Sequence, residues 1–239
     1  MKLNKIVSSI LSLSFVTLGI TSVYGVERRP INDVPLSELI RETEIINSNT
    51  SEFLDLVWWI PLEYWQTYFV QSGEVDSASS QQFLDVFASV FIVATLQADT
   101  SAIGLFDFFS QSEVEGGMVV TYEDEDGNST SLKPIEPSEE LALLLEMVKP
   151  ALSSVIGQLG TNMHFIVFSD VDSEGDRQVS PFQPGNLQVS LNNRQGQARS
   201  IIQLEFPLNS LFIPRICPNG KPAHISWKYC PWDGTELED

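Results

Sequence analysis

The chain has 239 residues, 13 basic and 32 acidic side chains, a net charge of −19 and 43% hydrophobic residues. A chain this acidic repels phosphate backbones, and no cluster of lysine and arginine offsets the charge, so we expect no nucleic acid partner. The length is enough for one well-cored domain and too short for two large ones.

Residues 1–25 have the pattern of an export signal. Met1–Lys5 is a short basic start, Ile6–Val26 carries no charge, and Val23–Gly25 supplies small or β-branched residues before a cleavage point. An uncleaved membrane anchor is the alternative, since about 20 apolar residues can span a bilayer. Serines and threonines in the run disfavour a permanent span. We therefore predict a cleaved signal, no membrane span afterwards, and a periplasmic or secreted protein.

The N-terminal third is predicted to be mainly helical. A helix beginning near Pro35 would present an apolar stripe, made of Leu36, Leu39, Ile40 and Ile45 or Ile46. Residues 53–69 are predicted to form two short helices that meet at Pro61. A further helix through Phe83 and Val90 then precedes a strand over residues 91–96.

The segment 53–69 also contains the densest group of aromatic residues in the chain. Its candidate ligand contacts are Trp58, Trp59, Tyr64, Trp65 and Tyr68. Such rings either cover the hydrophobic core or form an exposed surface for a small ligand or a protein partner. The sequence leaves both alternatives open.

The second half of the chain is predicted to supply a sheet and one long helix. Residues 118–122 and 129–132 flank Asp126-Gly127, the strongest short signal for a hairpin. Apolar residues at helical spacing predict a helix from Ser138 to Leu159, and Pro150 predicts a kink or a break in it near Met147.

Residues 161–170 read as a strand that is buried on both faces and central to the sheet. Residues 186–191 and 198–206 alternate as a second strand pair, with a turn at 192–196. The expected fold is therefore α+β, with a helical N-terminal third packed on a mainly antiparallel sheet. We expect one domain over residues 26–214, followed by a distinct tail over residues 215–239.

The acidic segment after the central strand resembles the start of a calcium-binding loop. Asp170, Asp172, Glu174 and Asp176 occupy the first, third, fifth and seventh loop positions. Pro181 stands where the loop needs its bidentate glutamate. The alternatives are a solvated acidic turn and a calcium site that serves adhesion.

Only two histidines, His164 and His224, are available for acid–base catalysis near neutral pH. His164 would share a strand face with Asn162, Ile166 and Phe168, where a histidine is more often a hydrogen-bonded core residue than a base. Hydrolysis by carboxylates and His164 would need that histidine in a concave, wet pocket.

The C-terminal tail contains two related segments, CPNGK at Cys217–Lys221 and WKYCPWDGT at Trp227–Thr235. They resemble the knuckles of a zinc ribbon, which normally read Cys-Pro-x-Cys-Gly. The first knuckle lacks its second cysteine, and Asp233 takes that place in the second. The remainder of the chain resembles uncharacterised secreted bacterial proteins that have the same degenerate tail, a resemblance that implies no activity.

Two interpretations of this tail remain open. In an oxidising compartment, Cys217 and Cys230 would form a disulfide that replaces the lost metal. In the other interpretation, Cys217, His224, Cys230 and Asp233 would hold Zn²⁺.

We expect an exported binding or structural module that is not an enzyme, needs no cofactor and contacts an unknown protein or small ligand. A periplasmic hydrolase that uses carboxylates and His164 is the alternative, and calcium-dependent adhesion is a weaker one.

Overall fold

In the computed structural model, which describes residues 26–49, 52–73, 77–172 and 174–237, two antiparallel sheets combine with five α-helices. This arrangement confirms the predicted α+β class. The export signal predicted at residues 1–25 lies outside the described residues. No helix among the described residues is both long and apolar enough to cross a bilayer.

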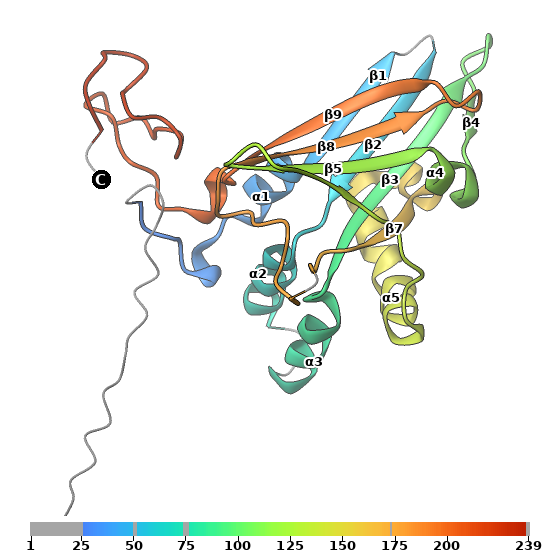
Figure 1. The fold of residues 1–239 in the computed structure, drawn as a ribbon, viewed down its shortest axis with the longest axis horizontal. Helices are drawn as coiled ribbons and strands as arrows, with labels where there is room; N and C mark the ends of the chain where they lie inside the picture. The colour runs from blue at the N-terminus through green and yellow to red at the C-terminus, as the bar shows by residue number, and fades with distance from the viewer. Residues whose placement is uncertain (1–25, 50–51, 74–76, 173, 238–239) are drawn as a thin grey trace, which may run out of the picture.

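The first sheet is built around β3, which pairs with β2, β4 and β7 (Figure 1). Its strands are β1 (Glu44–Asn49), β2 (Phe53–Trp59), β3 (Val90–Thr100), β4 (Phe106–Phe108) and β7 (His164–Ser169). The predicted central strand at residues 161–170 is therefore β7, a neighbour of β3 on one side. The expectation that it occupies the centre was wrong, because the longer β3 takes that place.

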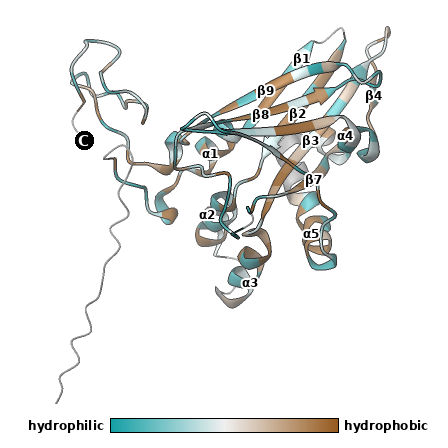
Figure 2. Cartoon of the chain, viewed as in Figure 1, coloured by the Kyte–Doolittle hydropathy of each residue, from teal (hydrophilic) through white to brown (hydrophobic). Residues whose placement is uncertain are grey.

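The second sheet has the order β6–β5–β8–β9. Its strands are β5 (Met118–Asp124), β6 (Ser129–Leu132), β8 (Gly185–Asn192) and β9 (Ala198–Phe206). The predicted hairpin at Asp126-Gly127 and the predicted pair over 186–206 are both confirmed. Buried and exposed residues alternate along β9, so this sheet has one buried and one solvated face. Figure 2 shows hydrophilic and hydrophobic segments along the same strand.

The helices are interspersed among the strands along the chain. They are α1 (Leu36–Thr43), α2 (Leu62–Ser72), α3 (Ser77–Phe87), α4 (Gln111–Gly117) and α5 (Glu139–Ile156), with short 3₁₀ turns η1 (Ile31–Asp33), η2 (Gly157–Asn162) and η3 (Asn209–Leu211). Helices α2, α3 and α5 gather together, away from β8 and β9 (Figure 1).

Two predictions for the N-terminal third were wrong. Residues 53–59 form strand β2 and not a helix, and Ile45 and Ile46 lie on strand β1 beyond the end of α1. Strand β2 is buried on both faces from Leu56 to Trp59. A strand covered on both sides shows no polar alternation, so its composition does not distinguish it from a buried helix.

Helix α5 continues through Pro150 and is not broken there. Proline removes one backbone hydrogen bond from the helix, to the carbonyl of Glu146. Both Pro150 and Glu146 are exposed, so water can satisfy the freed carbonyl.

Side chains of β2 show that the first sheet lies between two layers. The Trp58 ring meets Tyr64 of α2 edge-on, with ring centroids 5.4 Å apart. The neighbouring Trp59 points to the opposite face, where it stacks on Phe91 at 5.5 Å and meets Phe206 of β9 edge-on at 5.1 Å. The order of these layers is therefore α2, first sheet, second sheet.

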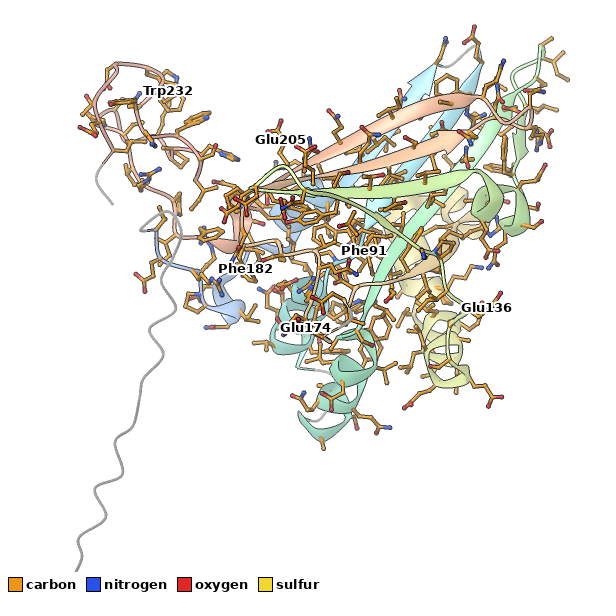
Figure 3. The ribbon with its side chains drawn as sticks, in the orientation of Figure 1. Phe91, Glu136, Glu174, Phe182, Glu205 and Trp232 are labelled. Carbon is orange, nitrogen blue, oxygen red and sulfur yellow. The ribbon has the colours of Figure 1, made fainter. Side chains whose placement is uncertain are left out.

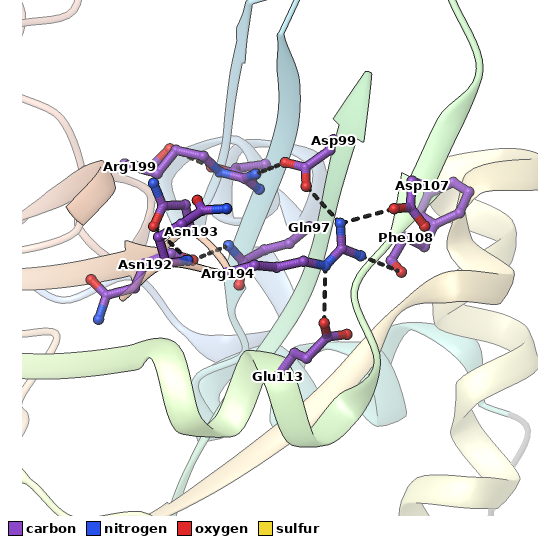
Figure 4. Close-up of polar contacts among 12 residues, drawn as sticks. Gln97, Asp99, Asp107, Phe108, Glu113, Asn192, Asn193, Arg194 and Arg199 are labelled. Carbon is purple, nitrogen blue, oxygen red and sulfur yellow. Dashed lines mark hydrogen bonds and ion pairs between the residues drawn. The ribbon is translucent and has the colours of Figure 1, made fainter. Parts of the chain in front are cut away.

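A chain of ion pairs joins the two sheets at one end (Figure 4). Arg199 of β9 pairs with Asp55 of β2 through two nitrogens and with Asp99 of β3 through the third. Asp99 also accepts from Arg194, whose guanidinium reaches Asp107 at 2.9 Å and Glu113 at 2.9 Å. Arg194 thus links the β8–β9 turn to β3, β4 and α4 through these ion pairs.

Within this network of ion pairs, Glu113 has a carboxyl group with a lowered pKa. Its carboxylate accepts from the backbone N–H of Ser110, from the Ser110 hydroxyl and from Arg194, and these bonds lower its pKa to about 2. Because the folded pKa lies below the ordinary value of 4.5, Glu113 stabilises the fold at neutral pH. That contribution is lost as the pH falls from about 5 towards 2.

We therefore expect Glu113→Gln to reduce the acid sensitivity of the protein. Between about pH 5 and pH 2, the urea midpoint of the variant should fall less than that of the parent. Glu115→Gln is the matched control, because Glu115 lies on the same helix but bonds Gln111 instead of Arg194. If the urea midpoints of the parent and of Glu113→Gln fell equally over this pH range, Glu113 would not contribute to the acid sensitivity.

Candidate functional site

A pocket of about 410 Å³ opens between α2, α3 and α5. Its walls are mainly aromatic and aliphatic, with a few polar groups. The lining residues are Trp65, Tyr68, Phe69, Ser79, Gln82, Phe83, Glu140, Leu144, Met147 and Val148. Ligand sites in proteins typically enclose about 300–1,000 Å³ with predominantly apolar walls, and this pocket matches both criteria.

Ring contacts between α2 and α3 shape one wall. Trp65 lies 5.1 Å from Phe83 and 5.2 Å from Phe87, measured between ring centroids. Phe69 meets Phe83 edge-on at 4.9 Å, and Phe83 stacks on Phe87 at 4.2 Å. Interlocking rings resist rearrangement, so this wall is formed before any ligand arrives.

The opposite wall comes from α5, whose apolar residues extend beyond the face that packs on the core. Leu141 and Leu145 are buried, whereas Leu143 and Met147 are 63% and 68% exposed. Leu144 and Val148 are half-buried and line the pocket. An apolar surface wider than the core requires is available for a ligand.

Polar groups in the lining are few. Gln82 of α3 donates to Glu140 of α5 at 3.2 Å, which ties the two helices together. The indole N–H of Trp65 is buried and has no hydrogen-bond partner among the described residues. Of the described residues that line the pocket, only Glu140 is charged.

A buried ion-pair cluster fixes the start of α2. Arg177 binds Glu63 of α2 at 2.9 Å and Asp170 at 2.9 Å, and Asp170 also accepts from the backbone N–H of Val179. Burial raises the pKa of the Asp170 carboxyl, while Arg177 and the Val179 N–H act in the opposite direction. The cluster therefore holds the helix that carries Trp65 and Tyr68 against the loop after β7.

The structure separates the five predicted aromatic contacts into two groups. Trp58, Trp59 and Tyr64 are buried and hold the layers together. Burial also raises the pKa of Tyr64 to about 12, so its phenol stays neutral. Trp65, which is also buried at 3% exposed, and Tyr68 line the pocket, so these two remain candidate ligand contacts.

The lining residues from α3 and α5 were not predicted from the sequence. Phe83 was predicted only as part of a helix, and the α5 residues only as part of the apolar helical pattern over residues 138–159. The available signal was Leu143 and Met147, which lie off the core-facing stripe of α5 and make that helix apolar on more than one side.

The predicted calcium residues do not converge. Asp170 points into the fold towards Arg177, and it is 1% exposed. Asp172 accepts from the backbone N–H groups of Glu174 and Asp176, as in an ordinary acidic turn. Among the described residues, no group of three or more His, Cys, Asp or Glu is placed to hold a metal ion. The calcium site stays a prediction.

His164 is half-buried, and its Nε2 lies 3.0 Å from the carbonyl oxygen of Phe109. It does not line the pocket between α2, α3 and α5. This geometry is that of a hydrogen-bonded structural histidine. Hydrolysis through His164 stays a prediction, and no contact of His164 with the described part of the chain favours it.

The structure brings together only some of the four predicted zinc ligands. Cys217 and Cys230 are buried, and the Cys230 thiol interacts with both Cys217 and the Asp233 carboxylate. The Nδ1 atom of His224 instead lies 2.8 Å from the Ser226 hydroxyl, and its ring packs against Trp227. The described residues therefore do not bring a fourth ligand to the thiols, and the zinc site stays a prediction.

Comparison of the chain with protein-family models, curated proteins and solved structures yields no match.

Proposed function

We propose that this protein is an exported, non-enzymatic binding module that holds a small apolar molecule in the pocket between α2, α3 and α5. Export is inferred from the basic start and uncharged run at the N-terminus. The observation that carries the binding function is the aromatic pocket itself, with three walls from separate helices and a volume in the range of known ligand sites.

The lining also indicates the charge of the ligand. Glu140 is the one charged side chain among the described lining residues, and the whole chain carries a net charge of −19. An anionic ligand would be repelled by both the local and the overall charge. The pocket therefore suits a neutral or cationic molecule with an apolar body.

Nile red, a neutral apolar dye, provides the test. We expect saturable binding with enhanced fluorescence, and at least about tenfold weaker binding to Gln82→Trp, a loss of about 1.4 kcal/mol. Gln82 is exposed in the pocket lining, so a tryptophan there fills the opening without entering the core. Octylamine and octanol should displace the dye more effectively than octanoate does.

Two control variants separate occlusion of the pocket from other effects. Gln82→Ala removes the bond to Glu140 but leaves the pocket open, so dye binding should persist. Leu143→Trp adds the same ring to an exposed position of α5 that does not line the pocket. Equal binding by the parent and Gln82→Trp would disprove the assignment.

A further inference from the structure

The C-terminal lobe, residues 214–237, stands apart from the sheets, as the position of Trp232 shows (Figure 3). Its own core consists of Cys217, Ala223, Cys230 and Leu237, separate from the main core of the molecule. Segments this small rarely fold on hydrophobic burial alone and generally depend on a cross-link or a metal. The lobe therefore needs a stabilising element beyond these four side chains.

Each of the two cysteines begins a tight turn. The Cys217 carbonyl accepts from the N–H of Gly220 at 2.8 Å, and the Cys230 carbonyl accepts from the N–H of Gly234 at 2.9 Å. Each cysteine N–H also closes its turn, onto Lys221 at 2.9 Å and Thr235 at 2.8 Å. Both glycines have positive φ, at 80° and 76°, a conformation that glycine adopts without strain. These backbone hydrogen bonds thus fix the positions of the two cysteines.

The surroundings of the sulfurs disfavour thiolates. Both thiols are buried, the Cys217 and Cys230 side chains hydrogen-bond to each other, and the Asp233 carboxylate is hydrogen-bonded to Cys230. A disulfide carries no charge, so it avoids the cost that a buried thiolate beside a carboxylate would incur. Environments that stabilise thiolates make disulfides easier to reduce, and the environment here acts in the opposite direction.

We propose that Cys217 and Cys230 are joined by a disulfide in the exported protein and that this bond replaces the metal of a zinc ribbon. The sulfurs form one S–S bond and release two protons and two electrons. A disulfide-containing oxidant accepts both electrons by thiol–disulfide exchange and leaves as two thiols. The inference rests on export into an oxidising compartment, and it is independent of the pocket.

The test uses the full chain, produced by secretion into a bacterial periplasm. The intact mass should rise by two hydrogen atoms on reduction, and the unreduced, denatured protein should not react with iodoacetamide. Two reactive thiols without metal would overturn the proposal, and so would two thiols with one equivalent of zinc.

Tryptic cleavage gives a second readout on the folded protein. The lobe contains one exposed tryptic site at Lys228, because Pro222 blocks cleavage after Lys221, whereas Arg41 is an exposed site on α1. Reduction, or the double substitution C217S/C230S, should speed cleavage in the lobe by at least about tenfold and leave cleavage at Arg41 unchanged. Equal cleavage rates in the lobe before and after reduction would contradict a cross-link that holds it.

Discussion

Replacing Arg199 with methionine is expected to lower the free energy of unfolding by about 3–5 kcal/mol, because it leaves a buried carboxylate without its cation. Asp55 is 0% exposed, and Arg199 binds it through two nitrogens. Methionine fills much of the same volume, so the loss would come from the unpaired charge. Equilibrium unfolding in urea measures the change.

Arg41→Met is the matched control for this variant. Arg41 pairs with Glu38 at 3.9 Å on the exposed surface of α1, and its side chain is 75% exposed. Exposed pairs of this kind contribute about 0–1 kcal/mol. If Arg199→Met lowered the free energy of unfolding by no more than Arg41→Met does, the ion pairs between the two sheets would not stabilise the fold.

Replacing Trp59 with alanine should cost about 3–5 kcal/mol, the range for deleting a large buried aromatic side chain. Trp59 is 1% exposed and contacts Phe91 of the first sheet and Phe206 of the second. Its removal would open a cavity at the interface between the sheets. The loss should appear as a lower urea midpoint with an unchanged slope.

Trp232→Ala provides the comparison for Trp59→Ala. Trp232 lies on the C-terminal lobe, where it is 48% exposed and meets Trp227 edge-on. Its loss should change the free energy of unfolding by at most about 0.5 kcal/mol. A small effect for Trp59→Ala as well would contradict the layer order described for the two sheets.

The features that the sequence predicted correctly depend on local chemistry. Asp126-Gly127 directs a hairpin because glycine accepts positive φ, which is 81° at Gly127. The strands over 186–206 were recognisable because the second sheet has one solvated face, which imposes alternation.

The features that escaped prediction depend on contacts between distant segments. Strand β2 resembled a helix because both its faces are covered, one by α2 and the other by β9. The pocket could be predicted only in part, because aromatic composition pointed to Trp65 and Tyr68 while the opposite wall lies on α5. No local pattern shows which exposed apolar residues of α5 face α2 and α3.

The most direct test of the binding function is the methyl NMR spectrum of the full chain, labelled at methionine, as 1-octanol is added. Met147 lines the pocket, whereas Met118 and Met163 are buried in the main core. We predict a saturable shift of the Met147 methyl signal, with Met118 and Met163 unchanged. An unmoved Met147 signal, or equal shifts at all three residues, would contradict a ligand site between α2, α3 and α5.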